Sequence, residues 1–200
     1  MDAVSILLDS GADPSIGDSQ KRSPLYMVAF RGYPKACKLL LENNADPNTI
    51  DVDGTSPLHA SIWNSKSNVT KLLLEHAADI NRTEFFHGNS PLHIAIQMKH
   101  FELCDLLIKV SSLCTHHSLT IHQQQANINY QRICDGNSPL HYSIECDFLV
   151  LGRFLARMPD TDLSLKNKSG ETAISMAINR NTDPDFIRSL KAAKDKATQQ

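Results

Sequence analysis

The chain contains few glycines, few cysteines and no long apolar run. Only 8 of its 200 residues are glycine, and none belongs to the G-x-x-x-x-G-K-[ST] pattern that holds phosphate groups. No stretch approaches the roughly 18 apolar residues of a membrane-spanning helix, and Met1-Asp2-Ala3-Val4 lacks the basic and apolar regions of a signal peptide. The 5 cysteines follow no disulfide-framework spacing. We therefore expect a cytoplasmic protein with reduced thiols and no membrane-spanning segment.

An excess of positive charge is also missing. The chain has 20 basic and 22 acidic residues, which gives a formal net charge of -2. Nucleic acids and anionic membranes attract proteins through an overall positive field. Neither is therefore expected as the main partner.

One tetrapeptide, Ser-Pro-Leu-His, recurs along the chain. It starts at Ser56, Ser90 and Ser138, and related copies start at Ser23 and Thr172. The starts lie 33, 34, 48 and 34 residues apart. A repeat of this length cannot bury its apolar face alone, so the pattern indicates one stack in which each unit packs against its neighbours.

Each repeat has the residues of two short helices joined by turns. In the copy that contains Ser56, Asp53-Gly54 suits a tight turn, Ser56 is a natural helix N-cap, and Pro57 stands where a first-turn proline loses no hydrogen bond. Val69 and Leu73 then recur at helical spacing. The unit is therefore predicted to be turn, helix, turn, helix.

The period and the T-P-L-H-x-A-like motif resemble those of ankyrin repeats from one end of the chain to the other. The resemblance implies an all-α solenoid of helix-turn-helix units with hairpin-like loops, forming a single domain over residues 1–200. It also implies that His59, His93 and His141 tie adjacent loops together, which makes them poor candidates for metal ligands or bases. The repeats are expected at 1–17 (partial), 18–50, 51–83, 84–132, 133–165 and 166–200 (capping).

Two places depart from the family pattern. The opening residues match only the second helix of a repeat. We therefore expect that preceding residues were removed or that a second copy covers this helix face. Apart from such a contact, the chain is expected to be a monomer. The long spacing reflects an insertion at about 109–125. The insertion contains four residues of types that bind metals: Cys114, His116, His117 and His122. Their spacing matches no established zinc pattern, so no metal site or cofactor is predicted.

Ankyrin stacks usually bind partners with their hairpin tips and the inner face of their first helices. Carrying those positions over gives eight predicted partner-binding residues: Phe30, Arg31, Trp63, Asn64, Phe86, His87, Gln97 and Met98. Aromatic residues beside an arginine are typical of binding hot spots. The alternative is that Trp63 and Met98 pack on neighbouring first helices and stiffen the stack.

The predicted function is a non-enzymatic protein-protein interaction module. No base or orienting group accompanies a cysteine in a pattern that indicates nucleophilic catalysis. The alternative is that the chain is the substrate-recruiting arm of a larger enzyme, such as a bacterial effector delivered into a host cell. The residues leave both interpretations open.

The resemblance also implies a modification. Some ankyrin repeats are substrates of an asparaginyl hydroxylase that favours a hairpin Asn with Leu eight residues before it. Asn48 follows Leu40 and Asn81 follows Leu73 at that spacing. Ala77 replaces the Gly that usually precedes the Asn81 hairpin, which predicts a softer junction there. We therefore expect Asn81 to be hydroxylated before Asn48.

Overall fold

The computed structural model describes residues 3–109 and 125–197. Within these two ranges the regular structure is helical, with one isolated β-bridge between Lys166 and Thr172 and no strand. The described helices are α1 (Ala3–Asp9), α2 (Pro24–Arg31), α3 (Pro34–Glu42), α4 (Pro57–Trp63), α5 (Ser67–Glu75), α6 (Pro91–Gln97), α7 (Phe101–Lys109), α8 (Pro139–Glu145), α9 (Leu149–Leu155), α10 (Ala173–Asn179) and α11 (Pro184–Ala197). The predicted all-α solenoid is confirmed.

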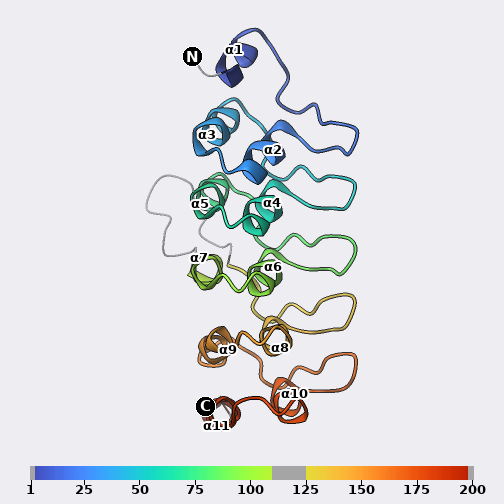
Figure 1. Ribbon diagram of the computed structural model, residues 1–200, viewed down its shortest axis with the longest axis vertical. Helices are drawn as coiled ribbons and strands as arrows, with labels where there is room; N and C mark the ends of the chain where they lie inside the picture. The colour runs from blue at the N-terminus through green and yellow to red at the C-terminus, as the bar shows by residue number, and fades with distance from the viewer. Residues whose placement is uncertain (1–2, 110–124, 198–200) are drawn as a thin grey trace.

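The helices stack in pairs, and a hairpin-like loop projects from the same edge of each pair (Figure 1). The first helices α2, α4, α6, α8 and α10 form one column, and the second helices form another beside it. Five described hairpins precede the first helices, and each is closed by a backbone hydrogen bond between its first and last residues; they span residues 18–22, 51–55, 84–89, 132–137 and 167–171.

The repeated tetrapeptide starts each of these first helices. The side chain of Ser56 accepts a hydrogen bond from the backbone N–H of His59, and Pro57 occupies the first turn. Thr172 caps α10 in the same way, although no proline follows it. The expected N-cap positions are confirmed, although the side chains of Ser90 and Ser138 make no capping hydrogen bond.

A continuous apolar core joins the repeats. The leucine after each proline is at most 1% exposed, and these leucines pack between successive first helices; they are Leu25, Leu58, Leu92 and Leu140. Cys37 and Cys104 are fully buried among the second helices, where burial raises the pKa of each thiol to about 12. Both cysteines therefore serve as small apolar side chains.

The hairpins are joined to one another by backbone hydrogen bonds. The N–H of Val52 donates to the Gln20 carbonyl at 3.1 Å, and that of Phe85 donates to the Asp53 carbonyl at 3.0 Å. Gly54 has a φ of +77°, and an added Cβ would lie 2.6 Å from the Phe85 ring. Glycine is therefore required there both for the turn and for the close approach of the next hairpin.

The three motif histidines are buried inside the stack, next to the hairpin loops. The Nδ1 atoms of His59, His93 and His141 each lie 2.8 Å from the Oγ of the preceding motif serine. Across the junction, Nε2 lies 3.3 Å from the Asn137 carbonyl for His93 and 3.0 Å from the Glu171 carbonyl for His141. All three rings are buried; the loop-tying role implied by the resemblance is confirmed for His93 and His141, whereas His59 Nε2 is buried without a hydrogen-bond partner.

The junction before Asn81 has the strained backbone that the sequence predicted. Ala77 has a φ of +62°, in the left-handed region that favours glycine. Asn44, at the same place one repeat earlier, also has a φ of +62°. The side chain of Ala can make no local hydrogen bond that offsets this conformation. Cys114, His116, His117 and His122, for which no metal site was predicted, lie outside the described residues.

Candidate partner-binding groove

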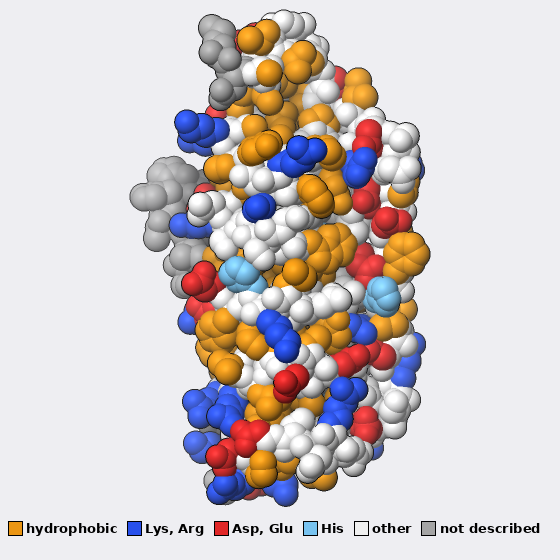
Figure 2. All heavy atoms as spheres, in the orientation of Figure 1, with side chains coloured by type: hydrophobic (Ala, Val, Ile, Leu, Met, Phe, Trp, Pro, Cys, Tyr) orange, Lys and Arg blue, Asp and Glu red, His pale blue; other side chains and the backbone are white. Residues whose placement is uncertain are grey.

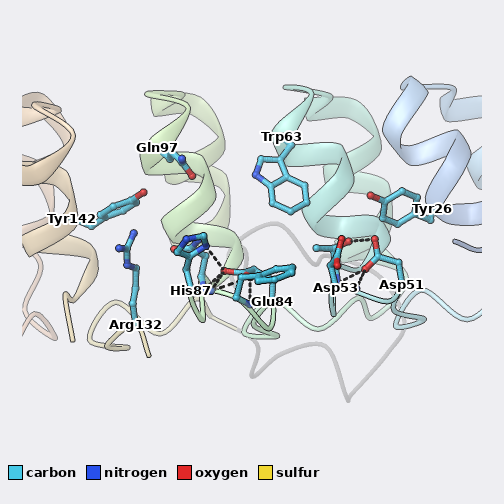
Figure 3. A pocket seen from close by; sticks show the side chains of 12 residues that line it. Tyr26, Asp51, Asp53, Trp63, Glu84, His87, Gln97, Arg132 and Tyr142 are labelled. Atoms are coloured by element: carbon cyan, nitrogen blue, oxygen red, sulfur yellow. Dashed lines mark hydrogen bonds and ion pairs between the residues drawn. The ribbon is translucent and has the colours of Figure 1, made fainter. Parts of the chain in front are cut away.

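A groove of about 450 Å³ lies between the first helices and the hairpins of the central repeats. Figure 3 shows side chains from both sides pointing into it. We call it the central groove; its lining residues are Tyr26, Asp51, Asp53, Thr55, Trp63, Glu84, Phe86, His87, Asn89, Gln97, Arg132 and Tyr142. It therefore crosses several repeats, from the start of α2 to the first turn of α8.

Acidic side chains support the hairpins on one side of this groove. Asp51 accepts hydrogen bonds from the backbone N–H groups of Asp53 and Thr55, both at 2.9 Å. Glu84 does the same for the third hairpin through Phe86, at 2.6 Å, and two further N–H groups. Although burial acts to raise the pKa of Glu84, these hydrogen bonds lower it below its ordinary value. Glu84 is therefore a carboxylate at neutral pH.

The third hairpin is one residue longer than the second. Five positions separate Asp51 from Ser56, whereas six separate Glu84 from Ser90. The longer side chain of Glu84 reaches the additional backbone N–H. The sequence analysis missed both acids; the signal for them was an acidic residue at the first position of a hairpin, five or six residues before the N-cap serine.

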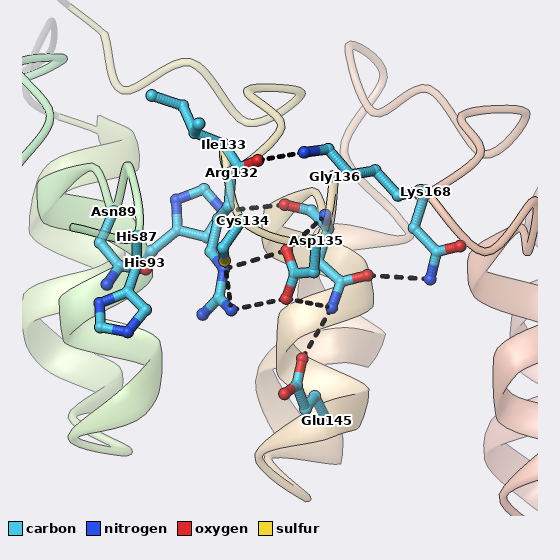
Figure 4. Close-up of polar contacts among 12 residues, drawn as sticks. His87, Asn89, His93, Arg132, Ile133, Cys134, Asp135, Gly136, Glu145 and Lys168 are labelled. Atoms are coloured by element: carbon cyan, nitrogen blue, oxygen red, sulfur yellow. Dashed lines mark hydrogen bonds and ion pairs between the residues drawn. The ribbon is translucent and has the colours of Figure 1, made fainter. Parts of the chain in front are cut away.

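The fourth hairpin has a basic residue at this position instead. The guanidinium of Arg132 lies 4.0 Å from the centre of the Tyr142 ring, and its Nη2 donates to Asp135 at 2.5 Å. Asn137 also donates to Asp135, at 2.9 Å, and to Glu145 at 2.7 Å (Figure 4). This end of the groove is therefore filled by internal polar contacts.

The structure brings together half of the predicted partner-binding residues. Trp63, Phe86, His87 and Gln97 line the central groove. The other four do not line it: Phe30, Arg31, Asn64 and Met98. Phe30 and Met98 are exposed, whereas the Asn64 amide donates to the carbonyl of Ala60 at 3.0 Å within its own repeat.

Trp63 both packs against the core and lines the central groove, so its part in partner binding stays a prediction. It is half-buried against the apolar core, and its ring centre lies 6.2 Å from that of His59. The same indole lines the central groove and is directed from α4 toward the hairpins (Figure 3). Met98, by contrast, is 44% exposed at the end of α6.

Apolar side chains are also exposed at the hairpin tips. Phe86 is 73% exposed and Phe85 is 63% exposed. Figure 2 shows hydrophobic side chains gathered in the middle of this face, beside acidic side chains of the hairpins. Phe85 covers Gly54 of the preceding hairpin, so Phe86 is the aromatic residue that the third hairpin offers to the groove.

The two remaining described cysteines differ in their surroundings. Cys134 is exposed at a hairpin tip, and Arg132 Nη2 lies 3.2 Å from its sulfur, a basic neighbour that the sequence analysis had not recognised. Cys146 is partly buried, and burial raises its pKa. Within the part of the chain that the structure describes, no group of three or more His, Cys, Asp or Glu side chains could hold a metal ion.

The predicted hydroxylation sites belong to a ladder of asparagines between repeats. The amide of Asn48 donates to the Ala77 carbonyl at 3.1 Å and accepts from the N–H of Asp79 at 2.7 Å. Asn81 makes the same pair of contacts with Gln125 and Asn127, at 3.0 and 2.7 Å. Each Asn side chain therefore bridges two repeats.

The comparison with protein families agrees with this architecture. A family model described as "Ankyrin repeats (3 copies)" matches residues 1–84 and 53–116, which together are more than half of the chain. The chain belongs to the ankyrin-repeat family. Ankyrin repeats are generally protein-protein interaction modules and are typically non-enzymatic. The search of curated proteins returned no match. Among the described helices, none has the length and apolar character needed to cross a membrane.

Proposed function

We propose that this chain is a non-enzymatic interaction module that binds an extended segment of a partner protein in the central groove and on the adjoining hairpin tips. The observation that carries the proposal is the groove itself, about 450 Å³ in volume and lined by Trp63, Phe86 and polar side chains. Aromatic rings in a partly enclosed site supply large contact areas with few rotatable bonds. A cytoplasmic location is part of the proposal and is supported by the free state of the four described cysteines.

The arrangement favours an extended segment over a small molecule. The groove is open and runs across several repeats, so a chain lying along it would contact successive hairpins. Exposed Phe86 would add contact area at the rim. Large exposed apolar side chains gathered on one face are typical of interaction surfaces.

Replacing Trp63 with Ala should weaken partner binding by about 2 kcal/mol, because an aromatic side chain at the centre of a groove has the position of a hot spot. Partners would be captured from lysate with the wild-type chain and the variant, and the affinity of each captured protein would then be measured by calorimetry. Tyr33→Ala is the matched control, since Tyr33 is an exposed aromatic residue that neither lines the groove nor belongs to the predicted partner-binding set.

Circular dichroism on the same samples separates binding from folding. Trp63→Ala is expected to keep the helical signal and cooperative unfolding, with a moderate loss of stability because Trp63 also touches the core. A sharp fall in melting temperature with unchanged affinity of the folded fraction would show that Trp63 acts only in packing. The proposed site would then be wrong.

We also propose that Asn81 and Asn48 are hydroxylated in a cell that contains an ankyrin-directed asparaginyl hydroxylase. The strained φ of Ala77 supports easier local opening beside Asn81, and an extended substrate is what such an enzyme needs. Incubation with the enzyme followed by peptide mass spectrometry should show one added oxygen on Asn81 before Asn48. Asn129 makes the same ladder contacts but has Ile121 where the pattern has Leu, so modification confined to Asn129, or at neither predicted site, would contradict this.

A further inference from the structure

In the last two described repeats, a polar contact links the hairpin to the first helix. The amide of Asn137 donates to Glu145 of α8 at 2.7 Å, and Asn179 of α10 donates to Glu171 at 2.7 Å. In both cases the partners are the last hairpin residue and the residue eight positions later. The side chains at these positions therefore have hydrogen-bond partners within the protein.

The third repeat lacks this contact. Asn89 and Gln97 occupy the corresponding positions, and both line the central groove. Asn89 is 7% exposed, and its Oδ1 is buried without a hydrogen-bond partner. Buried polar atoms in folded proteins almost always have a partner. A hydrogen-bond donor on a molecule bound in the groove would supply the partner that Asn89 Oδ1 lacks.

The charges around Asn89 favour a cationic donor. The carboxylates that face this part of the groove are Asp51, Asp53 and Glu84. Asp51 and Glu84 accept hydrogen bonds from their own hairpins, whereas the carboxylate of Asp53 has no hydrogen bond or ion pair within the described ranges. The basic residues on the lining are Arg132, which is paired with Asp135, and His87, whose Nδ1 lies 3.7 Å from Glu84. The carboxylates of the lining therefore outnumber its cationic groups.

The protein already places one cation in this groove. Arg132 lies over the Tyr142 ring and pairs with Asp135, so its guanidinium is held by an aromatic face and a carboxylate together. The middle of the groove offers the same two elements, since Figure 3 shows the Trp63 indole above the gap between Glu84 and Asp53. In the described part of the chain, no Lys or Arg lies over Trp63. Tryptophan is the best aromatic partner for a cation.

We propose that the central groove binds a Lys or Arg side chain of an extended partner segment. The charged end lies against Trp63, donates a hydrogen bond to Asn89 Oδ1 and faces the free carboxylate of Asp53. A neighbouring apolar residue of the same segment contacts Phe86. This inference rests on the proposed function, because it specifies the chemistry of the segment that the groove accepts.

Trp63 makes the groove directly observable, because it is the only tryptophan in the chain. A displayed library of random nonapeptides would be selected on the whole chain, and each selected peptide would be synthesised and titrated while Trp63 fluorescence is followed. Peptides that alter the fluorescence should contain Lys or Arg. Replacing that residue with norleucine or citrulline, which removes the charge, should weaken binding about tenfold or more.

Variants of the protein test the two named contacts. Asn89→Leu should weaken the basic peptide severalfold and leave its norleucine analogue, which has no donor, unaffected, and Asp53→Asn should do the same with either uncharged analogue. Glu102→Gln is the charge-matched control, because Glu102 is exposed on α7 and does not line the groove. Equal weakening of both peptides by Asn89→Leu would contradict the proposed hydrogen bond.

The outcomes separate this inference from the proposed function. Peptides that alter Trp63 fluorescence but contain no basic residue, or keep full affinity as the citrulline analogue, would overturn the inference and leave the proposed function standing. If no peptide alters the fluorescence and none binds elsewhere, both the proposed function and the inference fail. Peptides that bind only outside the groove would overturn both, because the proposed function also places the segment in the groove.

Discussion

Lowering the pH from 7 to 5 should reduce the free energy of unfolding by about 4 kcal/mol, chiefly because of two buried histidines. Burial lowers the pKa of His59 to about 4 and that of His93 to about 3. In the unfolded chain a histidine has a pKa near 6.5. Below that value the unfolded state binds a proton that the folded state does not.

The sign and the window follow from these values. At pH 7 the histidines are largely neutral in both states, so their contribution to stability is intact. As the pH falls below about 6.5, each of the two costs about 1.4 kcal/mol per pH unit, until the folded protein also takes up the proton near pH 4 or 3. Burial also lowers the pKa of His141, which adds to the loss in the same direction.

Carboxylates act in a lower window. The pKa values of Glu84 and Asp135 are lowered in the folded protein by hydrogen bonds that outweigh burial, so their contribution is lost only as the pH falls below the ordinary carboxyl range, near 4. Between pH 6.5 and 5 the histidines therefore dominate.

Urea unfolding at several pH values would measure this effect, with His93→Gln as the comparison. The variant should be less stable at pH 7, because the imidazole contacts are altered, but should lose about 2 kcal/mol less between pH 7 and 5. A wild-type stability that changes by under about 1 kcal/mol over this range would contradict the assignment of the buried histidines as the acid-sensitive groups.

The fold could be predicted from the sequence because its signals are local and repeated. A serine followed by a proline starts a first helix wherever it occurs, and the leucine that follows is buried in each of those repeats. The fifth repeat needed only Thr172 as its cap. Each repeat contacts its neighbours in the same way, so one correctly interpreted unit specified the others.

The central groove was only partly predictable. Carrying family positions over located Trp63 and Phe86, because position in a repeat determines which side of the stack a residue faces. It did not identify Glu84 as a groove-lining group, since the role of Glu84 depends on the added residue in the third hairpin and on which polar partners meet there. Pairings of that kind are set by three-dimensional distances between side chains, which the repeat period does not encode.

The difference between Asn89 and Asn137 leads to the second large effect. Asn137 is 4% exposed, and its side chain bonds Asp135, Glu145 and Asn167 at 2.9, 2.7 and 3.0 Å. Replacing it with Leu, which has a similar volume, removes all three contacts; Glu145 loses the donor described for it, whereas Asp135 keeps Arg132. Hydrogen bonds to charged groups contribute about 1.5 to 3 kcal/mol each, and part of that loss is recovered by hydration of the partly exposed partners. We expect Asn137→Leu to lower the free energy of unfolding by about 3 kcal/mol.

Asn89→Leu is the matched comparison, because it makes the same substitution at the same position one repeat earlier. Asn89 Oδ1 is buried without a partner, so Leu there removes an unsatisfied acceptor instead of breaking contacts. Its stability should stay within about 1 kcal/mol of the wild type or rise, since an unpaired buried polar group is itself destabilising. Urea unfolding followed by circular dichroism and by Trp63 fluorescence would measure both variants. Equal destabilisation by the two substitutions would mean that Asn89 Oδ1 has a hydrogen-bond partner inside the protein. The proposed cation would then find no unpaired acceptor at Asn89.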